Sequence, residues 1–118
     1  MQHQPVLLNE VLQYLAPKPG QVIVDGTFGF GGHAAAIARK IGPRGHLIGI
    51  EQDPRTLKAN QDIQDAIRRQ TKLSLGNANF SELREVLDRL KVATVDAILL
   101  DLGVSSFQLS DEEYGLSW

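Results

Sequence analysis

The chain of 118 residues contains no cysteine. This absence excludes disulfide bonds, thiolate zinc sites and a cysteine nucleophile. Positive charge is also scarce, because 12 lysine and arginine residues stand against 14 aspartate and glutamate residues, for a net charge of −2. The composition therefore lacks the basic footprint that nucleic-acid-binding proteins usually carry.

Long apolar runs are missing as well. No stretch approaches the roughly 20 apolar residues that span a bilayer. The first residues, MQHQPVLLNEVL, have no basic start, and Asn9 and Glu10 interrupt the apolar run that follows, so they do not form a signal peptide. The sequence predicts a cytoplasmic protein with no membrane partner.

What is present is an alternation of short apolar runs with helical segments. Buried strands are predicted at 22–24, 47–50 and 95–100, and a short strand is predicted at 72–75. Helices are predicted at 5–15, 34–40, 54–68 and in a segment that Asn79 or Ser81 caps. Asp53 is expected to cap the helix that begins at Pro54. This spacing predicts an α/β fold, a parallel sheet with helices on both faces.

The sequence supplies only the first four strands of such a sheet. A doubly wound sheet normally has about six strands, so residues 1–118 are expected to be the N-terminal part of a longer domain. The outer edge of the fourth strand is expected to be unpaired and apolar, and such an edge invites pairing. Truncation, a homodimer through this edge, or a partner protein that completes the sheet would each explain it.

The segment DGTFGFGGH, residues 25–33, joins the first strand to an alanine-rich helix and holds four glycines within seven residues. Glycine lets a ligand approach the backbone, and a helix N-terminus offers free N–H groups. A tight turn without a ligand is the alternative, but it needs fewer glycines. The loop therefore predicts a ligand site. Its spacing lacks the third glycine of the dinucleotide fingerprint, which argues against an NAD-dependent oxidoreductase.

Glu51 ends the second strand, about 20 residues beyond the glycine loop, where an acid binds ribose hydroxyls in nucleotide-binding folds. The loop and Glu51 together predict an adenosine-containing ligand. Asp25, Glu51 and Asp101 end three different strands, which leaves a metal site as an alternative. We expect no metal, because the glycine loop already accounts for an organic ligand.

Two further segments follow strands. Phe80 follows the third strand in the segment GNANF; it can stack on an adenine or begin the core of the next helix, and spacing leaves both readings open. Asp101 opens the segment DLGVSSFQLS directly after the fourth strand. Ser105 and Ser106 have no histidine partner at a recognisable spacing, which argues against a hydrolase triad.

Several segments together resemble a known family. In order, they are HQPVLLNEVLQYL, DGTFGFGGH, IGIEQDP, NFSEL and VDAILLDLGVSSFQLSDEEYGLSW. They are similar to the bacterial 16S ribosomal RNA cytidine-N4 methyltransferases, the MraW type of S-adenosylmethionine-dependent methyltransferase, from His3 to Trp118. The resemblance implies a Rossmann-like class I methyltransferase fold, with S-adenosylmethionine as the cofactor.

The resemblance also implies residue roles. Cofactor contacts are implied for Gly31, Gly32, His33, Glu51, Phe80, Asp101 and Gln108. Glu51 matches the acid that binds the ribose, where the family usually has aspartate. Phe80 matches an aromatic residue near the adenine. The implied substrate is the exocyclic amine of a cytidine in 16S rRNA of the small ribosomal subunit.

Methyl transfer to that amine suggests a hypothesis for catalysis. The lone pair of a cytidine amine is delocalised into the ring, and a hydrogen-bond acceptor beside the amine would localise it. The Asp101 carboxylate, or a carbonyl group of residues 102–105, is our candidate for this acceptor. The rival reading is a non-catalytic fragment or a degenerate paralogue that binds a cofactor or a partner protein.

Overall fold

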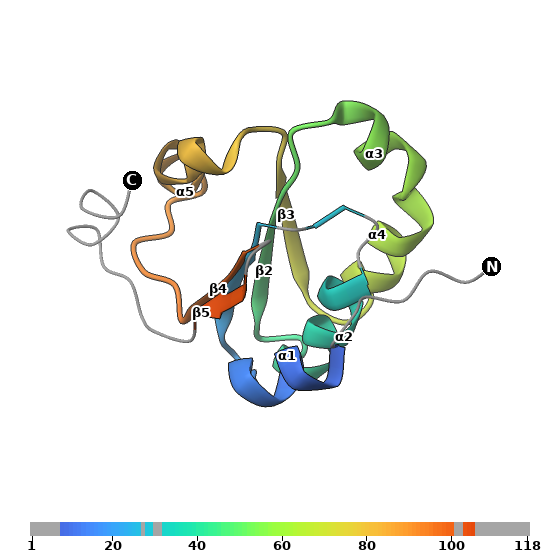
Figure 1. Cartoon of the computed structure of the whole chain (residues 1–118), viewed down its shortest axis with the longest axis vertical. Coiled ribbons are helices and arrows are strands. Elements are labelled where there is room, and N and C mark those ends of the chain that lie inside the picture. The colour runs from blue at the N-terminus through green and yellow to red at the C-terminus, as the bar shows by residue number, and fades with distance from the viewer. Residues whose placement is uncertain (1–7, 27, 30–31, 101–102, 106–118) are drawn as a thin grey trace.

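The computed structural model describes residues 8–26, 28–29, 32–100 and 103–105. They form one sheet with the strand order β3-β2-β1-β4-β5 (Figure 1). The strands are β1 (Val22–Asp25), β2 (His46–Ile50), β3 (Lys72–Gly76), β4 (Ala97–Leu100) and β5 (Gly103–Ser105). The strands β1 to β4 pair in parallel and β5 pairs antiparallel to β4. The predicted α/β fold with a parallel sheet is confirmed.

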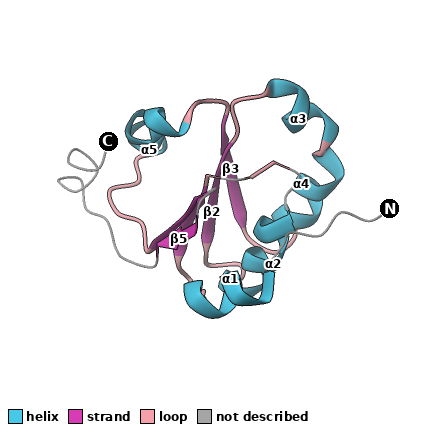
Figure 2. Cartoon of the chain, in the orientation of Figure 1, coloured by secondary structure: helices cyan, strands magenta, loops and turns pink. Residues whose placement is uncertain are grey.

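Helices cover both faces of the sheet (Figure 2). The helices α1 (Leu8–Leu15), α2 (Gly32–Ile41) and α4 (Gln61–Arg68) share one buried cluster with β1 to β4, and α5 (Leu83–Leu90) belongs to a second cluster. Because successive side chains of a strand point to opposite faces, Ile23 joins the first cluster and Val24 the second. None of the helices in the described part of the chain has the length and hydropathy of a membrane span.

The fourth strand is shorter than predicted. Val95 is buried as expected, but β4 begins only at Ala97. Between them, Asp96 binds the start of β1: its N–H donates to the Val22 carbonyl, and its Oδ2 accepts the Val22 N–H, both at 2.8 Å. This pair of bonds fixes the register of β4 beside β1.

The outer edge of β4 is not bare, which corrects the expectation from the sequence. Residues Ile98 to Leu100 face Gly103 to Ser105 of β5. An antiparallel neighbour needs only a two-residue connection, so a segment too short and polar to be recognised as a strand can still cover an edge. The predicted homodimer therefore loses the unpaired edge on which it depended.

The predicted helix at 54–68 is two helices. It divides at Asn60 into α3 (Pro54–Ala59) and α4. Asn60 has the non-helical dihedrals φ −106° and ψ 26°, and the side-chain amide of Gln64 donates to the Leu57 carbonyl across the break at 2.7 Å. Asn60 and Gln64 are only 4% and 7% exposed, so this break is a buried feature of the fold.

Candidate functional site

A pocket of about 320 Å³ opens at the carboxyl ends of β1 and β2. This is where open α/β sheets bind ligands. Its lining residues come from the ends of three strands and the loops after them: Gly26, Gly29, Ile50, Glu51, Gln52, Ala78, Asn79 and Phe80. The volume lies within the usual range for small-molecule sites.

Glu51 holds its carboxylate on the wall of this pocket. Its Oε1 accepts the Gly29 N–H at 3.1 Å, and its Oε2 accepts the Asp53 N–H at 3.0 Å. Each carboxylate oxygen has a second lone pair, so both can still accept a hydroxyl group. The side chain is half-buried. The arrangement is a pre-oriented acceptor joined to the glycine loop.

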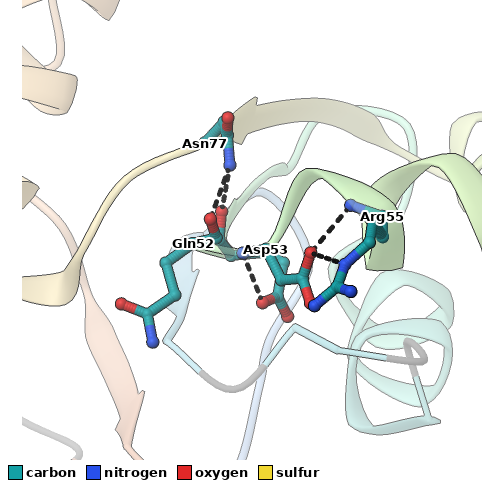
Figure 3. A network of polar contacts seen from close by, with 5 residues as sticks. Gln52, Asp53, Arg55 and Asn77 are labelled. Atoms are coloured by element: carbon teal, nitrogen blue, oxygen red, sulfur yellow. Dashed lines mark hydrogen bonds and ion pairs between the residues drawn. The ribbon is translucent and has the colours of Figure 1, made fainter.

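Asn77 supports the backbone on which Glu51 stands. Its side-chain amide donates to the carbonyls of Glu51 and Gln52, at 3.0 and 3.1 Å (Figure 3). The main chain adds two bonds, from the Glu51 N–H to Gly76 and from the Ala78 N–H to Glu51. The end of β2 is thereby tied to the segment that follows β3.

Asp53 is confirmed as the cap of α3. Its Oδ1 accepts the Arg55 N–H at 2.9 Å, and Pro54 follows as the first helical residue. The Arg55 guanidinium binds the same carboxylate (Figure 3), and these hydrogen bonds, first from the side chain and then from the backbone, lower the pKa of Asp53. Because its oxygens serve the cap, Asp53 is not the acid that faces the pocket.

Phe80 packs on the core and also lines the pocket, so the adenine-stacking role stays a prediction beside the core role. Its side chain is half-buried against the second core cluster. A Cβ placed on Gly26 would lie 2.9 Å from Cδ1 of Phe80, so the ring packs directly on the backbone at the end of β1. This close approach requires glycine at position 26, and it fixes one wall of the pocket.

The other predicted site residues either lie away from the pocket or fall outside the described part of the chain. Gly32 and His33 open α2, and neither lines the pocket. In the described part of the chain, the Nε2 atom of His33 is buried without a hydrogen-bond partner. Gly31, Asp101 and Gln108 lie outside the described residues. Asp101 was also the third carboxylate of the alternative metal site.

Sequence reasoning missed three polar residues of the site. Gln52 and Asn79 line the pocket, and Asn77 fixes the end of β2. Their common signal is position, since Gln52 lies two residues beyond β2, and Asn77 and Asn79 lie one and three residues beyond β3. The carboxyl ends of neighbouring parallel strands meet at one edge of a sheet, so polar residues there were candidates.

A family model described as the MraW methylase family matches residues 1–118. The chain belongs to the MraW methylase family. Among the curated proteins, a ribosomal RNA small subunit methyltransferase H of Azoarcus sp. is 48% identical over 118 residues, covering 100% of this chain and 36% of its own length. The protein of the same name from Acetivibrio thermocellus is 43% identical and covers 99% of this chain and 37% of its own length. The chain thus spans about a third of the length of these curated relatives.

Solved structures share the fold of this MraW family member. A SAM-dependent O-methyltransferase of Thermotoga maritima superposes with a TM-score of 0.56 at 24% identity, over 69% of this chain and 32% of its own. Fibrillarin of Aeropyrum pernix, in complex with natively bound S-adenosyl-L-methionine, superposes with a TM-score of 0.56 at 28% identity. The match covers 72% of this chain and 35% of fibrillarin. The Rossmann-like methyltransferase fold expected from the sequence is therefore confirmed.

Proposed function

We propose that this chain binds S-adenosylmethionine and forms the N-terminal, cofactor-binding part of a ribosomal RNA small-subunit methyltransferase. The observation that carries the proposal is the Glu51 carboxylate, which two backbone N–H groups orient at the pocket wall beside the glycine loop. Membership of the MraW methylase family, and the names of the relatives, support the same reading.

The residues of the pocket suit an adenosyl group. Glu51 offers free lone pairs to ribose hydroxyls, and the Phe80 ring offers a flat apolar surface to an adenine. Gly26 and Gly29 let a ligand touch the backbone. By family resemblance, Gly31, Gly32, His33 and Gln108 would complete the cofactor contacts.

The bound cofactor would supply an electrophilic methyl group on a sulfonium. Attack on it is an in-line displacement, so the main task of the protein is to hold the acceptor close and aligned. In our hypothesis, Asp101 accepts a hydrogen bond from the N4 amine of a cytidine in 16S rRNA and directs its lone pair. Such a substrate would place the reaction in the cytoplasm.

Calorimetry tests cofactor binding. We expect S-adenosylhomocysteine, the demethylated product, to bind to the folded protein and NAD to give no heat of binding. The glycine spacing, which lacks the dinucleotide fingerprint, is the reason for the second expectation. Absence of any affinity for S-adenosylhomocysteine would remove the proposal, and tighter binding of NAD would favour an oxidoreductase.

Catalysis needs a separate experiment, because a non-catalytic cofactor-binding fragment is the rival reading. The chain spans only 36% of the length of the Azoarcus relative, so its own activity is assayed directly. We expect the 118-residue chain alone to transfer little or no methyl to small ribosomal subunits. In a complete enzyme, Asp101→Ala should abolish the transfer; near-normal turnover would remove Asp101 from the mechanism.

A further inference from the structure

The glycine loop is held from outside the pocket by a buried amide pair. The side-chain amide of Asn60, at the break between α3 and α4, donates to the Gly29 carbonyl. The N–H group of Gly29 in turn donates to the Glu51 carboxylate. Both polar groups of Gly29, which has φ +41°, are therefore bound to side chains.

Gln64 fixes which way the Asn60 amide faces. Its Nε2 donates to Asn60 Oδ1 at 2.6 Å and to the Leu57 carbonyl at 2.7 Å. Asn60 must therefore present its oxygen to Gln64 and its NH₂ group to Gly29. Neither Asn60 nor Gln64 lines the pocket, and each is almost fully buried.

We propose that Asn60 and Gln64 are positioning residues that hold the glycine loop in the conformation that binds the cofactor. This inference rests on the proposed function, since it concerns the same pocket. It also gives the helix break a role, because the residue at the break, Asn60, is the one whose amide binds the Gly29 carbonyl. Without the amide, the Gly29 carbonyl would lack its buried donor and the loop would sample other conformations.

Substitutions at Asn60 separate this role from simple packing. Asn60→Asp keeps the size of the side chain but puts a carboxylate oxygen opposite the Gly29 carbonyl, whereas Asn60→Ala removes the side chain. We expect S-adenosylhomocysteine to bind about tenfold more weakly to Asn60→Ala and more weakly still to Asn60→Asp. A packing role predicts the reverse order, because the isosteric variant would then be the milder one.

Gln64→Glu tests whether Gln64 orients the Asn60 amide, and it leaves the residues of the glycine loop unchanged. A carboxylate at position 64 would attract the Asn60 NH₂ group and turn its oxygen toward Gly29. We expect a loss of affinity in the same direction as for Asn60→Asp. Gln61→Glu is the matched control, because it adds the same charge at an exposed neighbouring position and should leave the affinity unchanged.

The readouts keep this inference distinct from the proposed function. Dissociation constants are measured well below the melting temperature, where circular dichroism shows each variant folded, so that lost stability alone does not change them. Hydrogen exchange of the Gly29 amide is measured without ligand and should accelerate in Asn60→Asp and Gln64→Glu but not in Gln61→Glu. If wild-type protein does not bind S-adenosylhomocysteine, the proposed function fails. The exchange rates still show whether Asn60 and Gln64 hold the glycine loop in place. Unchanged exchange and unchanged affinity in both variants would overturn the inference.

Discussion

At the scale of single residues, the pocket depends on the space that glycines leave for aromatic rings. Gly26 admits Phe80 at the end of β1, and Gly49 in β2 admits Phe28. Phe28 is among the largest fully buried side chains and belongs to the first core cluster. The two rings lie near the two strands that carry the glycine loop and Glu51, so the shape of these strands depends on both glycines.

Gly49→Ala should destabilise the fold. Its new Cβ would lie 2.5 Å from Cδ1 of Phe28 and 3.0 Å from Cδ2 of Leu75. Overpacking of this kind costs about 1–3 kcal/mol of the free energy of unfolding, which urea denaturation measures. Combining it with Phe28→Leu makes room for the methyl group, so the double variant should be less destabilised than the sum of the single ones. Strict additivity would contradict the clash as the cause.

The identities of single site residues were partly predictable. Glu51 follows from its position at the end of a strand beyond a glycine loop, and the structure places it in the same pocket as Phe80. Asn60 was not predictable, because its partner Gly29 lies 31 residues earlier and no local pattern joins the two.

At the scale of elements, short apolar runs marked β1, β2 and β4, because parallel strands are covered on both faces. The break between α3 and α4 was not predicted, because it falls at Asn60 and no glycine or proline, the usual signals of a helix end, stands within residues 55–68. The strand β5 was missed because its three residues, Gly103–Ser105, have no apolar run. Local sequence patterns show which segments are buried. They do not show helix breaks or edge strands, because contacts with distant residues determine these.

The pairing of β2 with β3 carries a pH-sensitive contact. His46 Nε2 lies 2.8 Å from Ser74 Oγ, and burial, followed by the charge of Lys72, lowers the pKa of His46 below 6.5. The folded state thus disfavours the protonated ring. The stability that His46 contributes is present above about pH 6.5 and is lost as the pH falls through the lowered pKa.

We therefore expect the free energy of unfolding to decrease between pH 7.5 and pH 5.5, as urea denaturation would show. In His46→Gln, which has no titratable group at this position, part of that decrease should disappear. Comparison of the two proteins removes the effect of the other titrating groups. An identical pH dependence in both would show that His46 is not the group responsible.

At the scale of the whole molecule, two buried clusters on opposite faces of the sheet leave the carboxyl ends of the strands for ligand binding. The topology was predictable because alternation of strands and helices permits few arrangements. The family could be recognised because its glycine-loop segment and the segment that begins at Asp101 are both present in the sequence. The contributions of Gln52 and Asn79 to the pocket were not predicted, because they depend on how the ends of different strands meet in space.

The central claim is that the Glu51 carboxylate binds the ribose of an adenosyl cofactor. Calorimetry should compare S-adenosylhomocysteine with its 2′-deoxy analogue, on wild-type protein, on Glu51→Ala, and on Asp53→Asn as a control beside the pocket. We predict that loss of the hydroxyl weakens binding to wild type and to Asp53→Asn by about tenfold or more, but has little further effect on Glu51→Ala. An equal loss in Glu51→Ala would contradict the claim.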